Sequence, residues 1–233
     1  LPARLPYNSV KIYEVRKMIV IFNGKVYKTK DAINVQGKKC VKKEIFPQLT
    51  VSFNQSEKVN DETRGILTHD ANNWFFISVP QYVNLQSKKP LKRIGLLLES
   101  PHKDEYQNGI IRPANGVTGQ KIEALIAKRM PQLCSKLSCT NQYDYEIILI
   151  NAIQYQTSCY KILKESWSKT NRDHVFKLLF YNVDLKNDLT RRINNYNLDY
   201  VLNCVTSKLK DEVRDCYKKI HNNAADDDHP SAW

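Results

Sequence analysis

Glycine is scarce in this chain, with 7 residues among 233. The sequence has neither the G-x-G-x-x-G pattern of dinucleotide-binding folds nor the G-x-x-x-x-G-K-[ST] pattern of phosphate-binding loops. It also has no run of 18 apolar residues, so we expect no membrane-spanning segment and no membrane partner. The composition, 42% hydrophobic and 26% charged, predicts a chain that buries a packed core.

The cysteine pattern gives no sign of a disulfide framework or a metal site. No CxxC pair occurs among the six cysteines, and the four residues between Cys134 and Cys139 are a poor spacing for zinc. The histidines at 102, 174 and 221 show no metal-ligand spacing either. We therefore expect no metal and no cofactor, and the cysteine usage favours a reducing, cytoplasmic location.

Acidic residues are few in the first part of the chain. Residues 1–92 contain 16 basic and 7 acidic residues, a net charge of +9 out of +12 for the whole sequence. A basic region of this kind indicates a polyanionic partner, with nucleic acid first, although a solubilising surface would have the same composition.

Two regions differ in their hydrophobic pattern. In 1–90, β-branched and aromatic residues flank Asn23-Gly24, which predicts a hairpin over 18–27, and further strands are expected near 45–53 and at 74–79. The segment 87–90 is interpreted as a connector. We therefore interpret 1–90 as a small, basic, β-rich region.

After residue 90, short apolar strands alternate with helical patterns. Strands are expected at 93–98, 146–152 and 200–205, and helices at 119–129, 172–196 and 208–220. This alternation predicts an α/β domain over 91–233, with three αβα layers around a short central parallel sheet. Ligands bind at the carboxyl ends of such strands, where this sequence has Glu99, Asn151 and the region of Thr206.

Four polar motifs occur in order along this domain. They are Glu99-Ser100-Pro101-His102, Arg112-Pro113-Ala114-Asn115-Gly116 followed by Gly119-Gln120, Ile150-Asn151, and His229-Pro230-Ser231. In residue type, order and spacing they resemble the uracil-DNA glycosylase superfamily, most closely its iron–sulfur bacterial and archaeal branch, over about residues 93–233. The resemblance implies an α/β fold and an enzyme that removes a base from DNA.

The chain also departs from the family pattern. The cysteines that bind the cluster have no counterparts, and Asp226-Asp227-Asp228 stands where an apolar strand is usual, so a fourth strand is expected to be very short or missing. Ser100 replaces the Asp that orients water in the better-studied branch, and His102 replaces the Tyr that bars a 5-methyl group. Ala114 stands where the iron–sulfur branch has the Phe that stacks on uracil.

The resemblance assigns a role to each motif. His229 would donate a hydrogen bond to the departing base, and either Glu99 or Glu105 would hold the attacking water. Asn151 would read a base edge, and the backbone near Ser100 and His102 would bind the base carbonyl. Ala114 and Asn115 would border a pocket larger than that for uracil. The remaining expected DNA contacts are Arg112, Ser231 and, as an apolar wedge, Trp233.

The resemblance thus implies a monofunctional glycosylase that hydrolyses the N-glycosidic bond of a flipped base, and the expected base is a bulky modified pyrimidine, as in modified viral DNA. A uracil-excising repair enzyme, a nuclease and a non-catalytic nucleic-acid-binding protein on the same fold remain alternatives. The only run of carboxylates that a nuclease could use is Asp226-Asp227-Asp228. The sequence does not name the base.

Overall fold

The computed structural model describes residues 18–22, 25–28, 49–53, 58–79, 89–157, 173, 175–182, 184–218 and 222–233. The chain divides into two compact units, Leu1–Phe53 and Asn54–Trp233. In the described residues, no helix has both the length and the apolar character needed to cross a membrane.

The first unit contains a three-stranded sheet. Its strands are β1 (Met18–Phe22), β2 (Lys25–Lys28) and β3 (Leu49–Phe53), in the order β2-β1-β3. β1 and β2 are antiparallel, with Phe22 opposite Lys25, as the hairpin pattern predicts. The Asn23-Gly24 turn itself lies outside the described residues.

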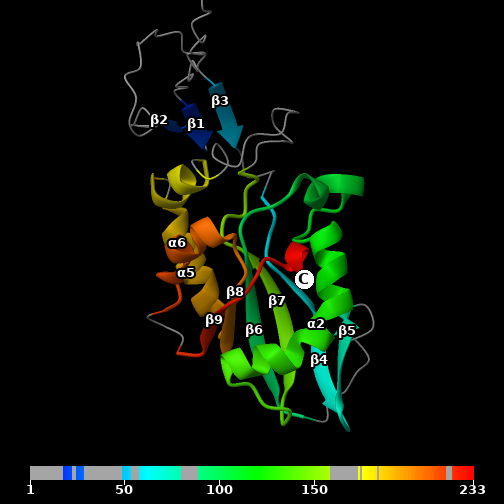
Figure 1. The fold of residues 1–233 in the computed structure, drawn as a ribbon. Helices are drawn as coiled ribbons and strands as arrows, with labels where there is room; N and C mark the ends of the chain where they lie inside the picture. The colour runs from blue at the N-terminus through cyan, green and yellow to red at the C-terminus, as the bar shows by residue number, and fades with distance from the viewer. Residues whose placement is uncertain are drawn as a thin grey trace, which may run out of the picture. The chain divides into compact units, whose positions relative to one another are not determined.

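The second unit is built on a six-stranded sheet with the order β5-β4-β7-β6-β8-β9 (Figure 1). The strands are β4 (Glu62–Asp70), β5 (Asn73–Ser78), β6 (Leu91–Leu98), β7 (Asp144–Asn151), β8 (Tyr200–Asn203) and β9 (Ala224–Asp226). β7, β6, β8 and β9 are parallel, whereas β4 runs antiparallel to both β5 and β7. The fold is therefore α/β with a mostly parallel sheet, as the sequence predicts.

The hairpin formed by β4 and β5 lies in this sheet, which differs from the boundary expected after residue 90. In the structure β4 pairs along β7, and its buried Ile66 and Leu67 extend the core of the α/β unit. The contacts divide the chain between Phe53 and Asn54 instead.

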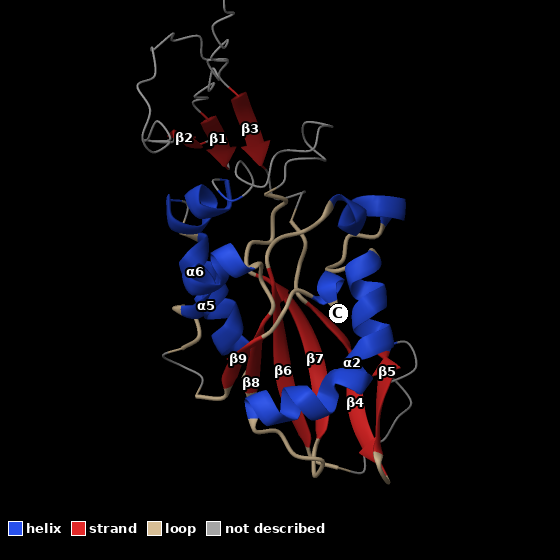
Figure 2. Ribbon diagram, viewed as in Figure 1, coloured by secondary structure: helices blue, strands red, loops and turns tan. Residues whose placement is uncertain are grey.

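Both faces of the parallel strands are buried, as in a layered α/β protein. On one face, Leu96 of β6 and Leu149 of β7 share a core cluster with Ile122 and Ile126 of α2 (Val117–Leu137). Side chains alternate along a strand, so the buried Leu97 points to the opposite face. Further helical segments in the described part of the chain are η2 (Lys103–Gly109), η3 (Leu178–Asn182), α5 (Leu185–Asn195), η4 (Ser207–Leu209), α6 (Lys210–Arg214) and η5 (Pro230–Ala232) (Figure 2).

The helices differ in extent from the sequence expectations. α2 is longer than 119–129 and continues through Pro131. The single helix expected over 172–196 is interrupted before α5, because Asp184 adopts a left-handed backbone with φ 64°. The helix expected over 208–220 is also shorter, ending in turns after Arg214. The fourth parallel strand, β9, has only three residues, in agreement with the expectation that it is very short or missing.

Candidate functional site

The strand order reverses at the carboxyl edge of the sheet. The connection after β6 leads to β7 on one side, whereas β8 lies on the other side of β6. This is a topological switch point, where open α/β sheets bind their ligands. Glu99 directly follows β6, and its Oε2 accepts a 2.6 Å hydrogen bond from the Thr206 hydroxyl, which follows β8. Two of the predicted strand ends therefore meet at this position.

A second buried contact joins Asn151 to Glu105. Asn151 ends β7 and is only 1% exposed, and its Nδ2 donates to Glu105 Oε2 over 3.2 Å. The other oxygen of Glu105 accepts from the backbone N–H of His102 over 3.1 Å. The Asn151 Oδ1 is buried and has no hydrogen-bond partner in the protein. The pair is therefore a buried carboxyl that fixes an amide, and the amide still has an acceptor to offer.

Burial raises the pKa of Glu105 to about 7. The hydrogen bonds from the His102 backbone, the Asn151 amide and the Ala114 backbone, together with the charge of Arg64, act in the opposite direction. A carboxyl with such a pKa changes protonation near neutral pH. Buried, strongly perturbed carboxyls are more frequent in functional sites than elsewhere, so this group strengthens the case for a site at this edge.

The loop between η2 and α2 forms one wall of the site. Its Arg112 N–H donates to the Glu105 carbonyl over 3.3 Å, and the Arg112 guanidinium pairs with Glu62 at 2.7 Å. Asn115 donates to the Ile110 carbonyl over 3.4 Å. Arg112 is thus held by a carboxylate of β4, and Asn115 stabilises its own loop.

Ala114 adopts a left-handed backbone with φ 51° and is buried in the core cluster. A larger side chain at this position would meet both an unfavourable backbone and core atoms. The pocket enlargement expected at Ala114 therefore stays a prediction.

Ser100 and His102 lie in the segment between β6 and η2. The Ser100 hydroxyl and the Thr157 hydroxyl are 2.8 Å apart. The His102 side chain is largely exposed, and its Nδ1 is 3.1 Å from a carboxylate oxygen of Asp104. Of these two residues, only His102 contributes a backbone donor to the Glu105 carboxyl.

His229 caps the short helix η5. Its Nδ1 accepts the Ser231 N–H over 3.2 Å and lies 2.8 Å from the Ser231 hydroxyl. In a neutral imidazole the nitrogen that accepts a backbone N–H lacks a proton, which places the ring proton on Nε2. The His-Pro-Ser motif thus fixes the tautomer that can donate through Nε2.

Trp233 packs on α2. Its indole N–H donates to the Asp228 carbonyl over 3.1 Å, and the Arg129 guanidinium lies 5.0 Å from the ring centroid. Lys121 of α2 donates to the carbonyls of Ser231 and Trp233. This segment is therefore fixed against the first half of α2, and the ring is partly buried against the core cluster.

Two charged clusters that support these loops are not evident from the sequence. The Arg192 guanidinium donates to both oxygens of the buried Asp61 at 2.8 Å and to the carbonyls of Asn151 and Ala152. Arg192 and Asp61 are 131 positions apart in the sequence, and no sequence motif indicates that they are in contact.

The second cluster holds the chain just before His229. The buried carboxylate of Asp227 binds Arg129 at 2.8 Å and Lys136 at 2.6 Å. These bonds hold the pKa of Asp227 below its ordinary value despite the opposing effect of burial. The acidic run could have indicated this anchor, but it gives no sign of which residues of α2 bind it.

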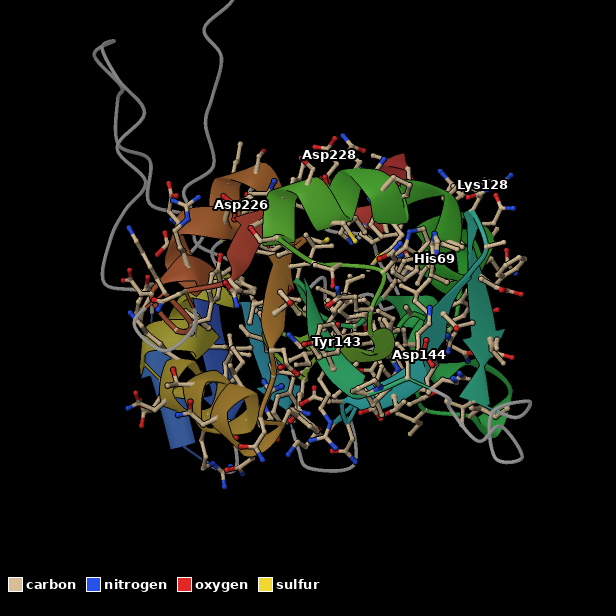
Figure 3. The ribbon with its side chains drawn as sticks, turned by 90° about the horizontal axis from the view of Figure 1, so that it is seen from below. His69, Lys128, Tyr143, Asp144, Asp226 and Asp228 are labelled. Carbon is tan, nitrogen blue, oxygen red and sulfur yellow. The ribbon has the colours of Figure 1, made fainter. Side chains whose placement is uncertain are left out.

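Other features lie outside this group of contacts. A cavity of about 330 Å³ is lined by Arg214 of α6, Tyr217 of the turn that follows α6, and Asp226 of β9, among others. Tyr143, Asp144 and His69 lie at the opposite end of the sheet, where β7 begins (Figure 3). Among the described residues, no group of three His, Cys, Asp or Glu side chains is arranged to hold a metal ion.

Comparisons of the chain with protein-family models, with curated proteins and with solved structures find no match.

Proposed function

We propose that this protein is a DNA glycosylase that hydrolyses the N-glycosidic bond of a base flipped out of DNA and leaves an abasic site. The observation that carries the proposal is the buried Glu105–Asn151 pair beside Glu99 at the switch point of the sheet. A flipped base needs a dry pocket with a few fixed polar groups, and it is read by hydrogen bonds to its edge. This edge of the sheet offers such groups on rigid strand ends.

Asn151 suits the task of reading the base. Because its amide N–H is directed at Glu105, the remaining group is the buried amide oxygen, which accepts hydrogen bonds. A base that presents an N–H there would satisfy an acceptor that is otherwise left unpaired, and unpaired buried acceptors are costly. The pair therefore selects a base with a donor at this edge, such as a ring imide or an exocyclic amine.

The carboxyl groups of Glu105 and Glu99 have different roles in the proposed reaction. Both oxygens of Glu105 accept hydrogen bonds from protein groups, so Glu105 orients Asn151. Glu99 is then the carboxylate that holds the attacking water, with Thr206 fixing one of its oxygens. The bond between the base nitrogen and C1′ breaks as the water oxygen bonds to C1′. The water proton passes to Glu99, and the electron pair leaves with the base.

His229 provides the donor for the departing base. The transition state resembles an oxocarbenium ion, with negative charge growing on the base. An imidazole whose Nδ1 accepts from Ser231 offers its Nε2–H to that charge. Pro230 and the anchor at Asp227 limit the movement of this segment.

The partner is proposed to be duplex DNA, because the chain carries a net charge of +12 and 9 of these charges lie in residues 1–92. The preferred base is proposed to be a bulky modified pyrimidine, as in modified viral DNA, which would place the protein in antiviral defence. Plain uracil, and with it DNA repair, is the alternative.

The test is a panel of duplexes carrying uracil, a thymine mismatch, 5-hydroxymethylcytosine or its glucosylated form. Abasic sites are detected as strand breaks that appear only after alkali, and the released base is identified by mass spectrometry. Alkali-dependent breaks that persist in EDTA support the proposal. Direct, EDTA-sensitive strand cuts would indicate a nuclease, and binding without breaks would indicate a non-catalytic module.

A further inference from the structure

Three of the most exposed large apolar side chains in the described residues lie close together in the sequence, two on the loop after η2 and one at the start of α2. Ile110 is 55% exposed, Ile111 47% and Val117 60%, and together we call them the aliphatic lip. The other exposed large apolar residues, Phe75, Leu91 and Tyr181, are on separate elements. Single exposed apolar residues are ordinary, but several close together indicate a surface that meets a partner.

The backbone of the lip is fixed while its side chains stay exposed. η2 ends at Gly109, whose φ of 71° turns the chain. The Ile110 carbonyl then accepts from the Asn115 side chain, and after Ile111 the Arg112 N–H donates to the Glu105 carbonyl. A loop anchored on both sides of two exposed β-branched residues presents them in a nearly fixed position, because such side chains are also stiff at χ1.

The lip borders the candidate site directly. The hydrogen bond between Arg112 and Glu105 connects it to the residue that orients Asn151, and Val117 is the first residue of α2. Figure 1 shows η2 and the beginning of α2 at the same end of the sheet. Any duplex that delivers a base to Asn151 would therefore bring its neighbouring base pairs close to the lip.

We propose that the aliphatic lip enters the base stack of duplex DNA and occupies the gap left by the withdrawn nucleotide. The inference rests on the proposed function, because it assumes a base taken out of a duplex at this edge. Apolar side chains are the groups that proteins insert between base steps, where they replace lost stacking contacts. The occupant of this surface is thus a DNA base stack.

Trp233 is the other residue that could fill this role, and its contacts oppose it. The indole N–H is bonded to Asp228, the ring lies beneath Arg129, and Lys121 binds the Trp233 carbonyl. Entry of Trp233 into DNA would break these contacts, whereas Ile110 and Ile111 are already exposed. The structure therefore favours the lip over Trp233.

The first experiment compares duplex and single-stranded substrates of the best base in the panel. The double variant Ile110→Ala/Ile111→Ala should lose about tenfold or more in duplex excision, the scale of one stacking contact, and keep near-normal excision from single strands. Phe75→Ala is the matched control, because Phe75 is 48% exposed but pairs with Thr68, toward the opposite end of the sheet. Equal losses on both substrates, or a duplex-specific loss in Trp233→Ala alone, would overturn the inference.

The second experiment does not depend on catalysis. A duplex with 2-aminopurine beside an abasic analogue reports unstacking as increased fluorescence when the full chain binds. We expect the increase with the wild type and Phe75→Ala, and its loss with the double variant at saturating protein. No increase with the wild type, or an unchanged increase with the double variant, contradicts the lip. A lip-dependent increase in a protein that excises no base would instead retain the lip and reject the glycosylase.

Discussion

Asn151 Nδ2 donates a hydrogen bond to Glu105 Oε2 over 3.2 Å, and both side chains are buried. One group thus fixes the orientation of the other at the carboxyl edge of the sheet. The arrangement leaves the Asn151 amide oxygen without a partner in the protein. The account of the site depends on this relationship, and the first two predictions test its two members.

Asn151→Ala should lower the rate of base excision by about 10²-fold, the scale of losing one fixed hydrogen-bonding group at the reacting centre. DNA affinity should change little, because phosphate contacts supply most of it. Single-turnover rates and a binding titration measure the two effects. Asn195→Ala, an exposed amide on α5, is the control and should match the wild type.

Glu105→Gln should change how stability depends on pH. Because burial raises the pKa of Glu105 from 4.5 to about 7, its contribution to stability is fully present below pH 4.5 and is lost as the pH rises to 7. This loss is about 3 kcal/mol in the wild type. The free energy of unfolding, measured with denaturant at pH 4.5 and at pH 7.5, should fall less between these two pH values in the variant than in the wild type. Asp70→Asn, at an exposed position, is the control, and its free energy of unfolding should fall between the two pH values as much as that of the wild type.

Asp227→Asn should destabilise the protein by about 2 kcal/mol, because Arg129 and Lys136 lose their common buried partner. The low pKa of Asp227 means that its contribution is present above pH 3.8 and is lost as the pH falls further. Asp211→Asn is the control, since the pair of Asp211 with Arg214 is exposed and should contribute less than about 1 kcal/mol. Equal effects of the two substitutions on denaturant unfolding would contradict the anchoring role.

Gly119→Ala should destabilise the protein, although the same change in an exposed helix stabilises it by about 1 kcal/mol. A Cβ on Gly119 would lie 1.8 Å from the Ala114 carbonyl oxygen and 2.6 Å from Arg64 Nη2. The first contact is to backbone and cannot be relieved by a side-chain rotation. The shift in the thermal midpoint of unfolding shows whether the substitution stabilises or destabilises the protein. A higher midpoint in the variant would mean that the backbone at Ala114 moves away from the added Cβ at little cost.

The sequence predicts much of this fold because its signals are local. The apolar runs of β6 and β7 and the polar residues that end them identify a parallel sheet and its carboxyl edge, and the facing residues of α2 identify its core side. The place of β4 and β5 in the main sheet could not be predicted, because the pairing of β4 with β7 is a long-range contact. The ion pair between Arg192 and Asp61 could not be predicted either, because it joins distant segments of the chain and no local sequence pattern indicates it.

The division into two units determines where a truncated protein should begin. Removal of residues 1–90 would take β4 and β5 out of the main sheet, so the cut belongs between Phe53 and Asn54. Residues 1–53 contain 11 basic and 3 acidic residues, a net charge of +8. A chain that begins at Asn54 should therefore bind DNA with a flatter dependence on salt. An equal slope of log affinity against log salt in both proteins would assign the first unit a different role.

The most direct test of the account is mass spectrometry of the base released from the modified-duplex panel by the wild type, Asn151→Ala and Glu99→Gln. The account predicts a free base and an equal amount of alkali-labile sites with the wild type, with the base bearing an N–H donor at the edge that Asn151 reads. It predicts at least about 10²-fold slower release with each variant. Release at wild-type rates from both variants, or no free base from any duplex despite tight binding, would contradict it.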